Sequence, residues 1–236
     1  MDIQAEKLIK IEMHAHTSEV SPCAAVDAKA VVKSCKNAGY AAVVITDHFN
    51  NYVLHGFPGN NRQKVKRYLE GFEIAKETGE SINIAVFFGI EVCLRGGPED
   101  YLIYGVEKEF LFDHPTLYNL SQKELYYEAI EANALVYQAH PCRSYCRPKD
   151  PFLMHGVEVF NGNSLHRGPG KGGDNNNDYA LKWALKYKHL LQISGSDIHH
   201  VEDIGVGGIA LRDNMEVKRY SDLMQYLRLS DYKLIY

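Results

Sequence analysis

The sequence lacks three features that would place it at once in a simple class of proteins. No run of apolar residues approaches a length of about 18, which a membrane span requires. The five cysteines are an odd number without a CxxC pair, which argues against a disulfide framework and against a zinc ribbon. The 26 basic residues are outnumbered by 30 acidic ones, so the net charge is -4 and no basic excess attracts nucleic acid. Membrane proteins, disulfide-stabilised domains and avid nucleic-acid binders are therefore disfavoured.

The remaining composition is that of a globular protein. Of the 236 residues, 45% are hydrophobic and 24% are charged. A chain of this length can bury a sizeable core without a disulfide or a structural metal, so we expect one domain over residues 1–236. The first residues, MDIQAEKLIK, carry charges where a signal peptide is apolar, so we expect a cytoplasmic protein.

Short β-rich runs alternate with amphipathic helices along the chain. The strands are predicted at 9–13, 41–46, 82–90, 101–105, 135–139, 157–160, 190–194 and about 206–211. Helices are predicted from Asp27 to Gly39, at 61–78, after the capping-box sequence at Ser121, around 179–187 and at about 216–228. The strands at 82–90 and 101–105 are too close for a helix between them, so this pair can be antiparallel. The alternation predicts an α/β fold, either a barrel or a doubly wound sheet.

Histidines and acidic residues gather directly after the ends of these strands. The set comprises His14, His16, Asp47, His48, Glu91, His140, Asn161, Asp197 and His199. In an α/β barrel the carboxyl ends of the strands meet at one mouth, where active sites are built. Charged groups packed so closely would repel one another unless cations lay among them. The pattern therefore favours a barrel with two or three zinc, manganese or iron ions at its mouth.

The order of motifs HAHT, TDH, GIE, AHP and SDIH resembles that of the PHP (polymerase and histidinol phosphatase) family of metal-dependent phosphoesterases. The resemblance covers about residues 9–215 and implies a distorted (β/α)7 barrel with a two- or three-metal centre. It implies that His14, His16, Glu91 and Asp197 hold a first ion. Glu91 would bridge to a second ion that His140 also binds, and His48 and His199 would hold a third.

Two positions depart from the family pattern. Asp100 stands where many members have a histidine, so the second ion has an oxygen ligand there or none. The segment SEVSPCA follows HAHT where a histidine or aspartate often completes the third site. Glu19 is the first candidate for that ligand, and Cys23 is the second. A thiolate at this position would favour zinc.

The resemblance suggests a chemistry in which a hydroxide that bridges two ions attacks the phosphorus of a phosphate ester. Glu91 and Asp197 would serve this centre, and the Arg143 guanidinium would clamp two phosphate oxygens, with Arg95 and Arg167 as reserves. The leaving group could be protonated by His200 or His166.

The leading hypothesis is a phosphoesterase that hydrolyses a small phosphomonoester metabolite or a nucleotide. The alternatives are a phosphodiesterase or exonuclease on short oligonucleotides, a non-catalytic metal-stabilised binding module, and a hydrolase of C–N bonds. The last would ordinarily need a ligating lysine, and none lies at a predicted strand end. Specificity is expected in the loops at 49–62, 142–152 and 163–178.

Overall fold

The computed structural model describes residues 8–143, 145–165, 176–212 and 215–236. Its strands are β1 (Leu8–Ala15), β2 (Tyr40–Ile45), β3 (His48–Phe49), β4 (Ala85–Cys93), β5 (Asp100–Tyr104), β6 (Leu135–Gln138), β7 (Gly156–Asn161), β8 (Leu191–Gly195), β9 (Gly208–Arg212) and β10 (Lys233–Ile235). Its α-helices are α1 (Ala28–Asn37), α2 (Asn51–Gly56), α3 (Asn61–Tyr68), α4 (Glu70–Ile82), α5 (Phe110–Asp113), α6 (Gln122–Glu131), α7 (Asn176–Ala184) and α8 (Tyr220–Leu229).

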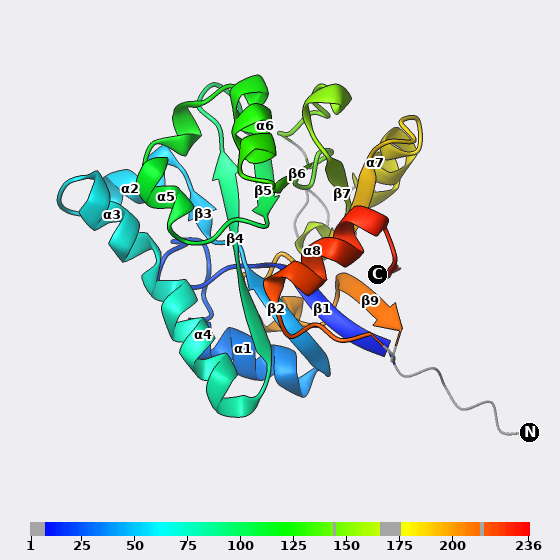
Figure 1. Cartoon of the computed structure of the whole chain (residues 1–236), viewed down its shortest axis with the longest axis horizontal. Coiled ribbons are helices and arrows are strands. Elements are labelled where there is room, and N and C mark those ends of the chain that lie inside the picture. The colour runs from blue at the N-terminus through cyan, green and yellow to red at the C-terminus, as the bar shows by residue number, and fades with distance from the viewer. Residues whose placement is uncertain (1–7, 144, 166–175, 213–214) are drawn as a thin grey trace, which may run out of the picture.

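The strands form a nearly closed, barrel-like sheet in the order β10-β9-β1-β2-β4-β5-β6-β7-β8 (Figure 1). The segment after β8, the last strand of the path, meets the end of β1. There Ala15 forms a parallel bridge with Ile198, and the backbone N–H of Ile198 donates to the carbonyl of His14 at 3.1 Å. The predicted distorted barrel is therefore confirmed, and the C-terminal ends of β1 and β8 lie side by side.

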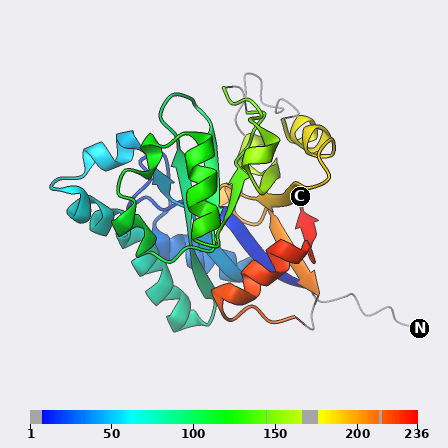
Figure 2. The same cartoon turned by 45° about the horizontal axis from the view of Figure 1, so that its top comes forward.

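The sheet is mixed rather than wholly parallel. The predicted antiparallel pairing of the strands near 82–90 and 101–105 is confirmed, because β4 and β5 are antiparallel, as are β5 and β6. Strand β9 also runs antiparallel to β1, and β10 adds to its far side. Figure 2 shows β10 in red beside β9 in orange. The prediction of successive parallel units did not include these antiparallel pairings, because the apolar pattern of a strand does not contain its direction in the sheet.

Apolar side chains fill the barrel interior. Ile11, Met13, Leu102, Tyr104 and Tyr137 are buried together. The Tyr104 hydroxyl on β5 donates to the carbonyl of Met13 on β1 at 2.8 Å, although these strands are not neighbours in the sheet, so this hydrogen bond crosses the interior. Helix α8 adds its apolar face, Leu223, Met224 and Leu227, to this core.

A second core lies between the sheet and the helices α1 to α6. Helix α1 begins after Asp27, whose carboxylate accepts from the backbone N–H of Ala30, and it buries Val31, Val32 and Cys35. It packs beside α4, as Figure 1 shows. Helix α6 begins at Ser121 with the predicted capping box. No helix in the described part of the chain is long and apolar enough to cross a membrane.

Three sequence predictions need correction. The predicted helix at 61–78 is two helices, α3 and α4, with Leu69 between them; Leu69 keeps helical backbone angles, so the break is a local irregularity. Helix α4 continues past Gly79 to Ile82 and ends at the left-handed Asn83. The helix predicted around 179–187 is α7, which begins earlier, at Asn176, and ends at Ala184.

Candidate metal centre

The end of β1 places two imidazoles side by side. The Nε2 atoms of His14 and His16 lie 3.1 Å apart, and both side chains are fully buried. Asp197, which follows β8, brings its Oδ1 to 3.4 Å from Nε2 of His14 and 3.1 Å from Nε2 of His16. This contact depends on the closure of the barrel, because Ile198 pairs with Ala15 between the two histidines.

The carboxylate of Glu91 on β4 lies between two pairs of imidazoles. Its Oε1 is 3.2 Å from Nε2 of His14 and 2.9 Å from Nε2 of His140. Its Oε2 is 3.3 Å from Nε2 of His16 and 2.6 Å from Nδ1 of His48. The two oxygens of one carboxylate therefore face different sets of ligand atoms.

Asp100 lies at the start of β5, directly opposite Cys93 on β4. Its Oδ2 is 3.9 Å from Nε2 of His140, and it groups with His48 and Glu91. Burial and the charge of Glu91 raise the pKa of Asp100. An oxygen ligand at this position, one of the two outcomes predicted from the sequence, is thus geometrically available.

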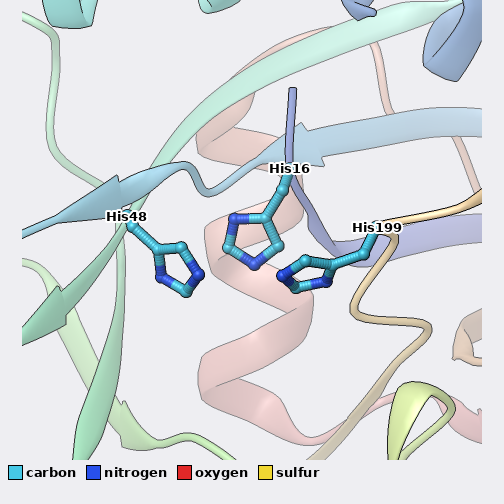
Figure 3. Close-up of side chains that lie close together, drawn as sticks. All are labelled: His16, His48 and His199. Carbon is cyan, nitrogen blue, oxygen red and sulfur yellow. The ribbon is translucent and has the colours of Figure 1, made fainter. Parts of the chain in front are cut away.

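Three imidazoles converge on the other side of Glu91 (Figure 3). The ring centroid of His16 is 4.3 Å from that of His48 and 4.5 Å from that of His199. Each of the three offers a ring nitrogen, and these nitrogens lie within 4.8 Å of one another. Nδ1 of His199 lies 3.0 Å from the backbone carbonyl of Asp197, so its Nε2 is left for a ligand.

The donor set fits divalent ions. Nδ1 of His140 is buried without a hydrogen-bond partner. Oε2 of Glu91 and Nδ1 of His48 lie 2.6 Å apart but are not aligned to hydrogen-bond each other, which is costly unless another group satisfies these atoms. Neutral imidazoles and carboxylate oxygens are the ligands that zinc, iron and manganese accept. The described residues therefore suit a centre of more than one ion.

In the buried carboxylates of the cluster, nearby positive charges lower the pKa more than burial raises it. Burial raises the pKa of Glu91, but the charges of His14 and His48 outweigh it and hold that pKa well below its usual value. Burial likewise raises the pKa of Asp197, but the charges of His14 and Arg143 outweigh burial and hold this pKa well below its usual value. For His16, burial and the charges of His48 and His199 act together and lower its pKa, so this imidazole is held in the neutral form that binds metals.

Two of the clustered residues have a left-handed backbone. His140, just after β6, has φ of 28°, and Asp197, just after β8, has φ of 55°. Residues other than glycine rarely adopt such angles, and each costs about 1–3 kcal/mol. Hydrogen bonds fix the turn at His140, whose N–H donates to Oε2 of Glu158 at 2.9 Å.

A family model for the PHP domain matches residues 12–228. The chain belongs to the PHP domain family. The fold and the mouth of the barrel agree with this membership. Apart from Asp47, the histidines and carboxylates of the five ordered motifs all lie in the cluster. No curated protein sequence matches the chain.

Solved structures share the PHP fold at low sequence identity. A two-domain protein from Bacteroides vulgatus, which contains a predicted PHP-like metal-dependent phosphoesterase, is 19% identical with a TM-score of 0.66, covering 100% of this chain and 67% of that one. PsfC from Pseudomonas syringae is 15% identical with a TM-score of 0.60, covering 92% and 88%. The lesion-specific endonuclease PfuEndoQ from Pyrococcus furiosus is 11% identical with a TM-score of 0.62, covering 97% of this chain and 58% of the endonuclease.

Arg143 reaches the cluster of histidines and carboxylates from the loop after His140. Its Nη2 donates to Oδ2 of Asp197 at 2.5 Å and to Oδ1 of Asn161 at 3.0 Å, while its Nε has no hydrogen-bond partner. Of the reserves, Arg95 follows β4 on another loop, and Arg167 and the acid candidate His166 lie outside the described residues. The other acid candidate, His200, follows His199 and donates its backbone N–H to Asp203.

Glu19 is not placed among the clustered groups. Both of its carboxylate oxygens accept from the backbone N–H of Ala28, at 3.2 and 3.0 Å, at the start of α1. Cys23, the second candidate, lies instead against two of the imidazoles, those of His199 and His48, with its Sγ 3.2 Å from Nε2 of His199. Burial raises the pKa of this thiol, but hydrogen bonds to His199 and His48 lower it to about 6.

Two buried glutamates that support the cluster were missed in the sequence. Glu158 on β7 contacts Nδ1 of His14 at 2.9 Å. Glu12 on β1 accepts the backbone N–H groups of Met13, His14 and Ser196, and burial raises its pKa to about 7. The signal was present in both strands, since each glutamate interrupts an apolar run in the middle of a strand, in IEM and in VEVF.

Asp47, from the TDH motif, does not lie among the candidate metal ligands but hydrogen-bonds to a neighbouring loop. Its carboxylate accepts from the backbone N–H and hydroxyl of Thr17 and from the hydroxyl of Ser21, each at 2.7 Å. These bonds hold the segment after HAHT against the end of β2.

Proposed function

We propose that the chain is a metal-dependent phosphoesterase that hydrolyses a small phosphomonoester, in particular a nucleotide or a similar phosphorylated metabolite. The observation that carries this proposal is the position of Glu91, whose two oxygens face different imidazole pairs. One carboxylate can thereby serve two ions at once. Pairs of ions of this kind are the usual arrangement for phosphoryl transfer to water.

The first two ions would share Glu91 and take their other ligands from different residues. His14, His16, Glu91 and Asp197 would hold the first ion, and Glu91 and His140, with Asp100, the second. His48 and His199 would hold a third. When bound, zinc, manganese or iron ions lower the pKa of water and neutralise charge on phosphoryl oxygens.

Arg143 is the residue proposed to bind the phosphate itself. The guanidinium is a planar fork that can hold two phosphate oxygens, and its Nε is free of hydrogen bonds. Its bonds to Asp197 and Asn161 fix the side chain beside the clustered ligands. Arg143 would therefore orient the ester and neutralise charge that grows on its oxygens.

A pocket beside the Arg143 loop supports a nucleotide-sized substrate. It has a volume of about 540 Å³ and lies between the loop that carries Cys142 and Arg147 and the segment of α7. Among the described residues its lining includes Arg147, Lys182 and Lys186, two aromatic rings, Tyr179 and Trp183, and no acidic residue. Helix α7 is tied to the cluster, because the Asn177 side chain exchanges two hydrogen bonds with the backbone of Asn161. Cations and aromatic faces together suit a phosphorylated compound with a ring.

The direct test is phosphate release from a panel of nucleotides and other phosphomonoesters. Protein stripped of metal would be refilled with manganese, zinc or iron, and Asp197→Ala would be the matched control. We expect metal-restored release by the wild type and loss of most turnover in the variant, which should remain folded by circular dichroism.

The same panel includes a short single-stranded oligonucleotide. Cleavage of the oligonucleotide without release from any monoester, with salt-sensitive binding, would replace the proposal with a phosphodiesterase. No reaction from protein that holds at least two ions per chain would favour a binding module instead.

A further inference from the structure

The segment after HAHT forms a loop that holds Cys23 beside His199. The backbone N–H of Ser18 donates to the carbonyl of Val26 at 2.9 Å and closes this loop. The N–H of Ala25 donates to the carbonyl of His199 at 2.8 Å, so the loop is bonded directly to the residue that its thiol approaches. The backbone around Cys23 is therefore held next to His199.

Glu19 is occupied elsewhere in the same loop. Its carboxylate accepts the otherwise unpaired N–H of Ala28 at the first turn of α1, a favourable place for a negative charge. Moving Glu19 to the imidazoles would leave this N–H without its acceptor. Of the two residues between His16 and α1 that were candidates for a ligand, only Cys23 contacts the histidine cluster.

The distance from Cys23 to His199 matches that between two ligands of one ion. For a tetrahedral zinc ion, typical bond lengths put a sulfur and a nitrogen ligand about 3.5 Å apart, close to the 3.2 Å between Sγ of Cys23 and Nε2 of His199. His48 also hydrogen-bonds to the thiol, and its Nδ1 lies 2.6 Å from Oε2 of Glu91. The Nδ1 of His199 faces the carbonyl of Asp197, a contact that orients a metal-binding imidazole.

We propose that Cys23 is a protein ligand of the third ion, together with His48 and His199, and that this position selects a thiophilic ion such as zinc over manganese. The inference rests on the metal centre of the proposed function and makes one part of that centre chemically different from the rest. The first two positions would have only imidazole and carboxylate ligands, which accept manganese and iron as well as zinc. A thiolate is a poor ligand for manganese, so the centre would be mixed in metal preference.

Cobalt(II) provides a test that does not depend on activity. A cobalt ion bound to a thiolate has a sulfur-to-metal charge-transfer band in the near ultraviolet, which imidazole and carboxylate ligands do not produce. Metal-free wild-type protein would be titrated with cobalt to three ions per chain. We expect the band in the wild type, its loss in Cys23→Ser, and its retention in Cys142→Ser, whose thiol lies on a different loop.

Metal content gives the second readout. We expect Cys23→Ser to bind about one zinc ion fewer per chain, and Cys23→Asp to bind manganese at the position that the wild type refuses. Cys23 is exposed, so both variants should fold, which circular dichroism would check. A band that persists in Cys23→Ser, or no band in wild-type protein loaded with three ions, would overturn the assignment.

Failure of this inference is distinguishable from failure of the proposed function. Absence of the band together with metal-restored phosphate release would remove Cys23 as a ligand and leave the phosphoesterase intact. A band without phosphate release from any substrate would keep the ligand and remove the reaction.

Discussion

Nδ1 of His14 lies 2.9 Å from Oε1 of Glu158, and both side chains are fully buried at the centre of the barrel mouth. A carboxylate on one ring nitrogen fixes the proton there and turns the other nitrogen toward an ion. The second oxygen of Glu158 accepts the backbone N–H of His140 and the amide of Asn161, each at 2.9 Å. One glutamate thus orients residues from three separate strand ends.

Replacing Glu158 by glutamine should weaken metal binding without removing a ligand. The amide keeps the size of the side chain but loses the charge that supports His14, and such supporting contacts are worth about 10–100-fold in metal affinity. Competition with a chelator would measure the change. Glu73→Gln on α4, an exposed residue paired with Lys108, is the matched control and should leave the affinity as it is. Equal affinities for both variants would show that Glu158 has only a packing role.

Arg143→Ala should mainly raise KM for a phosphomonoester, by about tenfold or more, because a charged hydrogen bond contributes about 1.5–3 kcal/mol. Arg143→Lys should recover only part of this loss, since an ammonium cannot hold two oxygens in one plane. Steady-state kinetics at saturating metal would separate KM from kcat. A fall in kcat alone would mean that Arg143 acts by positioning Asp197, to which it is bonded.

Removal of metal should lower the melting temperature. Ions that bind only the folded chain at a hundredfold excess over Kd contribute about 2.7 kcal/mol, which is about 5–10 °C for a protein of this size. Calorimetry before and after chelation, with refilling as the reversal, would measure it. Calcium, which prefers sites made of oxygen ligands, should restore little. An unchanged melting temperature would argue that the buried cluster is satisfied without ions.

The pocket beside α7 should contribute to the binding of nucleotides more than to the binding of small phosphate esters. Joint replacement of Lys182 and Lys186 by alanine removes two of its three cations, so we expect KM for a nucleoside monophosphate to rise severalfold. KM for phenyl phosphate should stay within twofold. Lys33→Ala, an exposed lysine on α1, is the control for loss of charge alone. The same rise for both substrates would place the lysines in general steering of anions.

The fold and most of the cluster could be predicted because both depend on local signals. The continuous apolar run of β2 and the histidines directly after β1 and β6 are visible in a few residues each. Parallel strands then bring their carboxyl ends to one edge, so position along the chain becomes position in space. The membership of His14, His16, Glu91, His140 and Asp197 in one cluster follows from this rule.

What could not be predicted depends on contacts between distant segments. The contacts of Glu19 depend on the start of α1, where the backbone N–H of Ala28 binds its carboxylate. The role of Glu158 depends on which face of β7 meets the end of β1, a register that no local pattern contains. The antiparallel strand β9 returns from the far end of the chain to pair with β1.

The left-handed backbone angles at His140 and Asp197 place two strained residues at the barrel mouth. Glycine would adopt both turns at little steric cost, so a screen for thermal stability alone would tend to reward the loss of these two ligands. Stability and metal binding would then pull the same two positions in opposite directions. A thermostabilised form of this protein should be selected with metal present, so that the bound ions offset the strain of the backbone that holds them.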